Sequence, residues 1–273
     1  MEPIMTITEK NSTHQEEASL RRLLDIMAAL RGENGCPWDK EQDHKSLRKY
    51  VIEEAYEVVD AIDQAKDELV IEELGDLLLQ IVFHAQIGKE EGRYSFTEIA
   101  DGISDKMIRR HPHVFGTEHC DTAGQVMVTW AAVKAKEKEG KDGRRMDVPL
   151  AFPALYRGEK LQKKAAEVGF DWDHSDDVRQ KILEELAEVD EAIAQDDREH
   201  LKEEMGDLLF AVVNWSRFHH IDAEEALRES NHKFVTRFNC MEDLIVADGK
   251  SMENMTLSEM DIYWEKAKKV LKP

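Results

Sequence analysis

Carboxylates at recurring spacings are the residues of this chain best suited to chemistry. Each of two segments contains two pairs of acids three residues apart, which are Glu54, Glu57, Glu73 and Asp76 in the first segment and Glu185, Glu188, Glu204 and Asp207 in the second. Residues three apart share one face of a helix, and each acid directly precedes a residue of an apolar helical stripe. We therefore expect both rows to border a buried seam, where carboxylates repel one another and lose solvation. Oxygen ligands of this kind favour Mg²⁺ or Mn²⁺ over zinc.

The two segments are copies of one unit. Residues 53–62 and 72–85 match residues 184–193 and 203–216 at one offset of 131, with 13 of 24 aligned positions identical. A solvated acidic face ordinarily explains one such pair of acids in an acidic protein, but the repetition favours a cation site. A glycine inside each second helix, Gly75 or Gly206, costs helix stability, which predicts a close backbone approach at that point or, equally, a role in helix packing.

Basic and aromatic residues follow both acidic segments. Lys106, Arg110, Trp130 and Lys134 correspond to Lys233, Arg237, Trp264 and Lys268, and a Trp-Asp pair precedes each acidic segment. Phosphate oxygens are the usual complement of Mg²⁺, and Lys233 and Arg237 would neutralise phosphates that the cation does not reach. Trp264 would stack on a base or ribose. Taken singly, these residues are more typical of a surface pair and a core tryptophan than of a binding site, and it is their recurrence beside both acidic rows that favours nucleotide contacts.

Helical periodicity covers most of the chain and predicts an all-α fold. Apolar residues recur at helical spacing beside the acids, as at Val51, Ala55 and Val58. Ser95 and Thr256 begin capping boxes, and the segment 175–177 offers caps for the helix that follows. Short polar links predict antiparallel helix pairs. We expect a flexible tail (1–16), a helical repeat (17–138), a linker (139–153) and a second helical repeat (154–273).

Charge and hydropathy exclude several classes of protein. The chain has 58 acidic and 37 basic residues, for a net charge of −21, which argues against direct nucleic-acid binding. The apolar runs fall far short of the roughly 20 residues of a membrane span, and no secretory signal is visible. The three cysteines include no CxxC pair, which argues against a disulfide framework or a zinc ribbon. We expect a cytoplasmic protein that does not bind membranes.

In combination, the motifs resemble the MazG family of all-α nucleoside triphosphate pyrophosphohydrolases. The resemblance rests on the order EExxE, EE(L/M)GDLL, KxxxRF and WxxxK, and on GCPWDKEQ, EEAYEVVDAI and RRHPHVFG in the first half, and it covers about residues 18–271. It implies two tandem MazG-like helical bundle repeats and a homodimer. It also implies Mg²⁺-dependent hydrolysis of nucleoside triphosphates to the monophosphate and pyrophosphate, with broad base specificity.

The resemblance also implies roles for individual residues. The implied metal ligands are Glu185, Glu188, Glu204 and Asp207, and the implied nucleotide contacts are Lys181, Glu184, Glu203, Lys233, Arg237 and Trp264. We interpret Glu184 as the group that orients or deprotonates the attacking water. His200 stands where a lysine is common and is left out of the site. The resemblance places catalysis in the second repeat, but the first keeps Glu54, Glu57, Glu73 and Asp76, so a second active site stays open.

Other interpretations of the same residues remain. A non-catalytic nucleotide–Mg²⁺ sensor or a dimeric scaffold would use the same acids without turnover. A di-iron bundle needs Glu-x-x-His on two helices, and the two copies, at 41–44 and 229–232, occupy non-equivalent places. The His-Pro-His run at 111–113 is more typical of loop packing and capping than of metal binding. Cys36 is more typical of a packed thiol than of a nucleophile.

Overall fold

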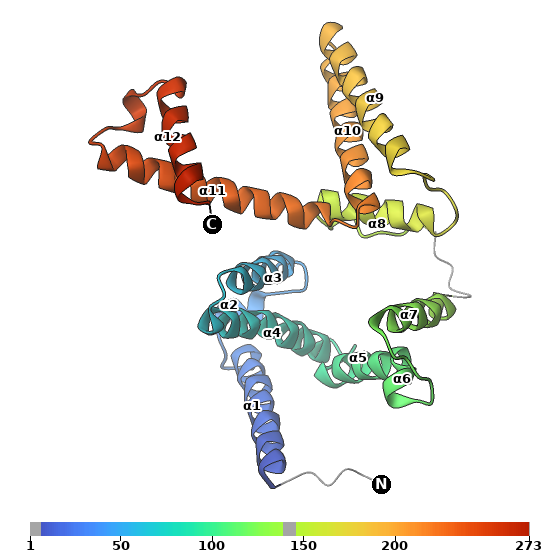
Figure 1. Cartoon of the computed structure of the whole chain (residues 1–273). Coiled ribbons are helices and arrows are strands. Elements are labelled where there is room, and N and C mark those ends of the chain that lie inside the picture. The colour runs from blue at the N-terminus through green and yellow to red at the C-terminus, as the bar shows by residue number, and fades with distance from the viewer. Residues whose placement is uncertain (1–6, 139–145, 273) are drawn as a thin grey trace. The chain divides into compact units, whose positions relative to one another are not determined.

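The computed structural model describes residues 7–138 and 146–272, which form helices, turns and loops and contain no strand (Figure 1). The helices are α1 (Ile7–Arg31), α2 (Pro37–Glu41), α3 (Arg48–Asp63), α4 (Asp67–Glu90), α5 (Phe96–Arg110), α6 (Pro112–Phe115), α7 (Ala123–Lys138), α8 (Ala154–Ala166), α9 (Ser175–Ala194), α10 (Arg198–Phe218), α11 (Ala223–Ala247), the 3₁₀ helix η1 (Met252–Asn254) and α12 (Leu257–Val270). The all-α prediction is confirmed. The chain divides into two compact units, Met1–Gly140 (unit 1) and Lys141–Pro273 (unit 2).

Unit 1 is organised around the antiparallel pair α3 and α4. A tight turn joins them, in which Ala65 adopts a left-handed conformation with φ of 52°. Helix α1 packs against α4, and α5 contacts α4, α6 and α7. The core lies between α1, the segment before α3, and α4, where Met27, Leu47 and Val82 are almost wholly buried.

Unit 2 repeats this plan with the antiparallel pair α9 and α10, which α8 crosses at one end (Figure 1). Asp196 takes the left-handed conformation in the connecting turn, with φ of 53°. Gly158 lies at the crossing of α8 and α10, where a Cβ would be in ordinary van der Waals contact with the Phe210 ring at 3.4 Å. Helix α12 folds back on α11, and Ile245 and Ala267 are fully buried between them.

The helix ends agree with the sequence in most places. Ser95 and Thr256 form the two capping boxes predicted from the sequence. The cap of α9 differs, because His174 is the N-cap residue and Ser175 begins the helix, with its Oγ 3.0 Å from Nε2 of His219. Helix α1 begins at Ile7, within the segment expected as a tail, where residues such as Gln15 and Glu16 favour a helix without an apolar stripe. The expected linker lies partly outside the described residues.

None of the helices in the described ranges is both long and apolar enough to cross a membrane.

Candidate metal and nucleotide site

Three carboxylates of unit 2 converge on the facing sides of α9 and α10. Glu185, Glu188 and Glu204 each place one oxygen within 4.8 Å of the others. The side chain of Glu185 is only 6 % exposed, so this carboxylate lies inside the helix pair rather than at its surface. Antiparallel packing causes the convergence, because it sets a row near the middle of α9 against a row in the first half of α10.

Two basic side chains surround these acids. Nζ of Lys181, one turn before Glu185 on α9, lies 2.8 Å from Oε1 of Glu185 and 2.7 Å from Oε1 of Glu184. These two hydrogen bonds raise the pKa of Lys181 above its usual range. On α10, Nε2 of His200 lies 2.9 Å from Oε1 of Glu204. The structure thus places His200, which the sequence analysis left out, at the acidic cluster.

The carboxylates of the cluster repel one another and are partly removed from solvent. Desolvation raises the pKa of Glu188, and the hydrogen bond and charge of Glu185 raise it further. Carboxylates that share a site in this way resist ionisation, and a bound cation relieves the repulsion. The donor set, three carboxylates with no sulfur or imidazole ligand among them, therefore fits a hard divalent ion.

Unit 1 has the same constellation. Glu54, Glu57 and Glu73 also bring one oxygen each within 4.8 Å of one another. Desolvation raises the pKa of Glu54 and of Glu73, and neighbouring acids add to both shifts. The repeat of the sequence is thus a repeat of the site geometry.

The fourth acid of each row and the adjacent glycine differ from expectation. Asp76 and Asp207 are exposed and do not belong to the groups that converge within 4.8 Å. The close approach predicted at Gly75 and Gly206 is wrong for the single chain, because a Cβ at either position would meet no atom within 4 Å. The reason is that both glycines lie on the open flank of the helix pair.

The basic and aromatic residues predicted to contact a nucleotide lie elsewhere in unit 2. Lys233 and Arg237 are on α11, and Trp264 is on α12, where its ring centroid is 5.5 Å from that of Phe234. Figure 1 shows α11 leading away from the α9–α10 pair, with α12 folded on α11. Within one chain, the structure does not bring these three residues to the acidic cluster.

The equivalent residues of unit 1 interact with one another. The guanidinium of Arg110 lies 5.3 Å from the centre of the Trp130 ring, and Nζ of Lys134 lies at the same distance from it. Arg110 also forms an ion pair of 2.6 Å with Glu137. Further along, Nδ1 of His111 is 2.7 Å from the Met107 carbonyl oxygen at the end of α5, which is the capping arrangement expected for this His-Pro-His run.

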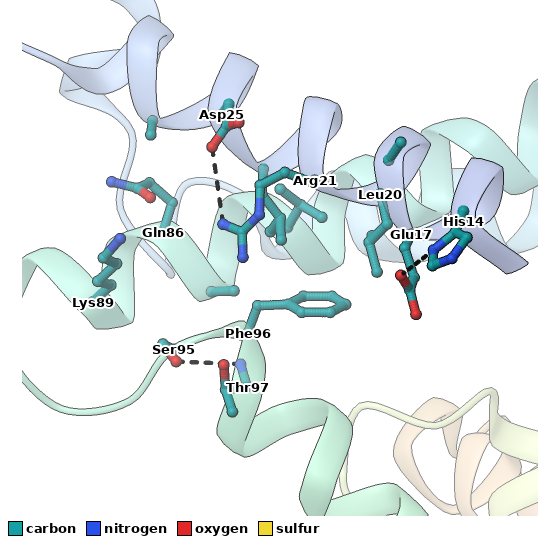
Figure 2. Close-up of a pocket in the computed structure, with 15 residues that line it drawn as sticks. His14, Glu17, Leu20, Arg21, Asp25, Gln86, Lys89, Ser95, Phe96 and Thr97 are labelled. Carbon is teal, nitrogen blue, oxygen red and sulfur yellow. Dashed lines mark hydrogen bonds and ion pairs between the residues drawn. The ribbon is translucent and has the colours of Figure 1, made fainter.

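A wide groove also opens in unit 1. It lies between α1, α4 and the start of α5 and has a volume of about 800 Å³ (Figure 2). The ring of Phe96 extends into it, and ion pairs such as Arg21–Asp25, at 3.9 Å, line its wall. None of the acids of the unit 1 cluster lines this groove, so it is separate from that cluster.

Comparison with known proteins agrees with the two repeated helix pairs. The MazG nucleotide pyrophosphohydrolase domain matches residues 42–115 and 174–241, which contain the two helix pairs. A Thermotoga maritima protein named nucleoside triphosphate pyrophosphohydrolase/pyrophosphatase MazG is 47 % identical over 247 residues, 90 % of this chain and 94 % of its own length. An Escherichia coli K12 protein named nucleoside triphosphate pyrophosphohydrolase is 44 % identical over 91 % of this chain and 96 % of its own. The chain belongs to the MazG family.

Proposed function

We propose that the chain hydrolyses nucleoside triphosphates to the monophosphate and pyrophosphate at the acidic cluster of unit 2. The observation that supports this proposal is the convergence of Glu185, Glu188 and Glu204 in a chain whose close relatives are named for this reaction. We further propose that Mg²⁺, or Mn²⁺ in its place, is the cofactor, with Asp207 joining the three glutamates as a ligand. Broad base specificity and a cytoplasmic location are also part of the proposal.

When bound, Mg²⁺ would neutralise phosphate oxygens and stabilise the charge that develops on the leaving pyrophosphate. Water attacks the α-phosphorus, the bridging bond between the α- and β-phosphates breaks, and pyrophosphate leaves. Glu184 accepts the proton of the attacking water on its carboxylate. Lys181 holds Glu184 in place at 2.7 Å and balances the charge of Glu185. Glu203, next to Glu204 on α10, contacts the nucleotide.

We also propose that the protein acts as a homodimer. Apolar side chains on the outer faces of α9 and α10 are about half exposed in one chain, among them Leu186, Met205 and Leu209. Pairing two such faces buries this surface. Because α11 carries Lys233 and Arg237 away from the acids of their own chain, we propose that both residues, with Trp264 on α12, reach the nucleotide from the second chain.

Product identification tests the reaction. Purified full-length protein is incubated with each nucleoside triphosphate and Mg²⁺, and we expect the monophosphate and pyrophosphate in equal amounts. Release of the diphosphate and orthophosphate would reject this chemistry. Tight nucleotide binding without any product would favour the alternative of a nucleotide–Mg²⁺ sensor or a scaffold.

A matched pair of variants locates the active unit. Glu185→Gln removes a ligand from the cluster in unit 2, and we expect it to abolish turnover. Glu54→Gln makes the equivalent change in unit 1 and should leave most of the activity, because the catalytic contacts are proposed for unit 2. Equal losses of kcat in the two variants would contradict the assignment to one unit.

A further inference from the structure

His200 contacts the acidic cluster of unit 2 from the first turn of α10. Nε2 of its ring lies 2.9 Å from Oε1 of Glu204, four residues further along the helix. An ionised carboxylate only accepts hydrogen bonds, so the proton of this bond is carried by Nε2 of His200. The bond engages one oxygen of Glu204, and the carboxylate keeps its second oxygen, Oε2, as a ligand atom for a hard cation.

This hydrogen bond is partly shielded from water. The side chain of Glu204 is 13 % exposed and that of His200 is 38 % exposed, so the carboxylate is mostly removed from solvent while the imidazole stays in contact with it. A hydrogen bond to a carboxylate is stronger than one between neutral groups, and it gains further strength where water is excluded. The bond therefore restricts the carboxylate of Glu204 to one orientation, whereas a free glutamate side chain samples several rotamers.

The start of α10 holds the backbone of His200 in place. Asp197 is the N-cap residue of this helix, and its Oδ1 accepts from the backbone N–H groups of Glu199 and His200, each at 3.1 Å. These bonds satisfy two of the donors that the first turn of a helix leaves without a partner. The imidazole therefore reaches Glu204 from an ordered helical turn rather than from a frayed helix end.

Helix α9 makes a matching contact with the cluster. Nζ of Lys181 lies 2.8 Å from Oε1 of Glu185, again at a spacing of four residues. Two of the three converging carboxylates, Glu185 and Glu204, are thus each held by a donor one turn earlier on their own helix. Donors of this kind orient the carboxylates that bind a metal, and their loss typically lowers metal affinity by about 10- to 100-fold.

Unit 1 provides a natural comparison. Leu69 of α4 precedes Glu73 by four residues, as His200 precedes Glu204. A leucine side chain has no polar atom and cannot donate a hydrogen bond to the carboxylate. The N-cap residue of α4 is Lys66, which makes no side-chain capping bond to the start of the helix. The same helix pair with the same acids therefore occurs in this chain once with the histidine and once without it.

We propose that His200 is a positioning residue of the metal site, which fixes the carboxylate of Glu204 for the cation and does not bind the cation itself. This inference rests on the proposed function, because it takes the acidic cluster of unit 2 as the place where the divalent cation binds. The role depends on a hydrogen-bond donor at Nε2 rather than on a positive charge. A neutral amide nitrogen at the same place should therefore perform it.

Titration of the metal-free full chain with Mn²⁺, followed by electron paramagnetic resonance of the free ion, tests this role without any nucleotide. All proteins carry Glu54→Gln and Glu73→Gln, which disable the unit 1 cluster, so that the Kd belongs to unit 2. We expect His200→Ala to raise the Kd about tenfold or more, and His200→Gln, whose amide nitrogen replaces Nε2, to stay within about threefold of the parent. His174→Ala is the matched control, because it removes an exposed histidine that makes no capping bond, and it should bind like the parent.

The converse substitution in unit 1 tests the same role without altering His200. In a full chain whose unit 2 cluster is disabled by Glu185→Gln and Glu204→Gln, Leu69→His places an imidazole four residues before Glu73. We expect it to lower the Kd of Mn²⁺ at the unit 1 cluster about tenfold, while Leu69→Phe, which adds a ring without a donor, leaves the Kd within about twofold. An equal change in the two variants would overturn the inference.

Two further results would overturn the positioning role. One is an unchanged Kd in His200→Ala, even where the variant melts at a lower temperature, because the contact would then serve only the fold. The other is a nitrogen coupling in the electron spin echo spectrum of bound Mn²⁺ that disappears in His200→Ala, which would make the histidine a ligand. Failure of the unmodified chain to hydrolyse nucleotides would contradict the proposed function but not this role, since Mn²⁺ binding needs no turnover. Absence of Mn²⁺ binding to the unmodified chain would overturn both.

Discussion

Single residues distinguish the two acidic clusters. In unit 2, Lys181 and His200 each contact a carboxylate, whereas the positions 131 residues earlier are Tyr50 and Leu69. The charge of Lys181 lowers the pKa of Glu188 and so opposes the desolvation that raises it. Unit 1 has no basic side chain at either equivalent position, and the pKa values of Glu54 and Glu73 are both raised. The two clusters therefore differ in the basic side chains that contact their carboxylates.

A histidine pair gives unit 1 a pH-dependent stability. Nδ1 of His44 and Nδ1 of His84 lie 2.7 Å apart, so one ring donates and the other accepts, while Nε2 of His44 lies 3.3 Å from the Tyr94 hydroxyl and 3.8 Å from Oε2 of Glu91. Burial lowers the pKa of His84 below its ordinary value of 6.5, and the charge of His44 lowers it further. The unfolded chain then binds more protons than the folded one, so unit 1 loses stability as the pH falls below about 6.5 towards the folded pKa.

Hydrogen exchange of α4 between pH 7.5 and pH 5.5, corrected for the intrinsic rates, measures this loss. His84→Asn is the matched control, because the amide keeps a polar atom near the position of Nδ1 but does not titrate. We expect the unmodified chain to lose more protection than the variant. An equal loss in both proteins would show that His84 is not responsible.

At the level of elements, each helix pair holds a partly or wholly buried glutamate between its helices and exposes much of its apolar surface. Glu185 is buried between α9 and α10, while its neighbour Leu186 is 46 % exposed. The same inversion occurs in unit 1, where Glu54 is half-buried and Ile52 and Tyr56 are exposed. The apolar faces of such a helix pair are not covered within one chain. Exposed apolar faces of this extent are typical of surfaces that bind another element.

The cap of α12 should control the local stability of that helix. The hydroxyl of Thr256 accepts from the backbone N–H of Glu259, and Oε2 of Glu259 accepts from the backbone N–H of Thr256 at 2.8 Å. Thr256→Ala removes one half of this capping box and should cost about 1 kcal/mol, or about fivefold in the opening equilibrium of α12. Hydrogen exchange over residues 257–270 measures the effect. Thr256→Ser keeps the hydroxyl and should exchange like the unmodified chain, and equally fast exchange in both variants would contradict the role of the cap.

At the scale of the whole molecule, the two units share one arrangement of helices but differ in the side chains around their carboxylate clusters. Each has an antiparallel helix pair with a carboxylate cluster. Unit 2 adds Lys181 and His200, which contact its carboxylates, whereas Tyr50 and Leu69 stand at the equivalent positions of unit 1. This asymmetry supports one proposed catalytic unit and one unit whose helix pair serves structure or assembly.

Dimerisation should be necessary for activity if the second chain supplies Lys233 and Arg237. Leu209→Glu puts a charge on the outer face of α10, where Leu209 is 56 % exposed, without touching the acids. We expect this variant to be monomeric by sedimentation and to lose at least tenfold in kcat/KM. Leu257→Glu changes a leucine that is 80 % exposed on α12 and serves as the control, which should stay dimeric and active. A monomeric Leu209→Glu protein with full activity would contradict a site shared between chains.

The sequence by itself determined the helices, the repeat and the membership of the acidic rows. Periodicity, capping residues and the single offset of 131 are local or pairwise properties, and the structure reproduces the helices that they predict and brings together three of the four acids of each row. Spacing along one helix could not show which side of that helix meets its partner. Only the tertiary structure decided that Glu185 faces inward and Leu186 outward, that His200 reaches Glu204, and that α11 takes Lys233 away from the acids. The physical reason is that these outcomes depend on how whole helices pack, and packing is set by contacts between residues that are distant in the chain.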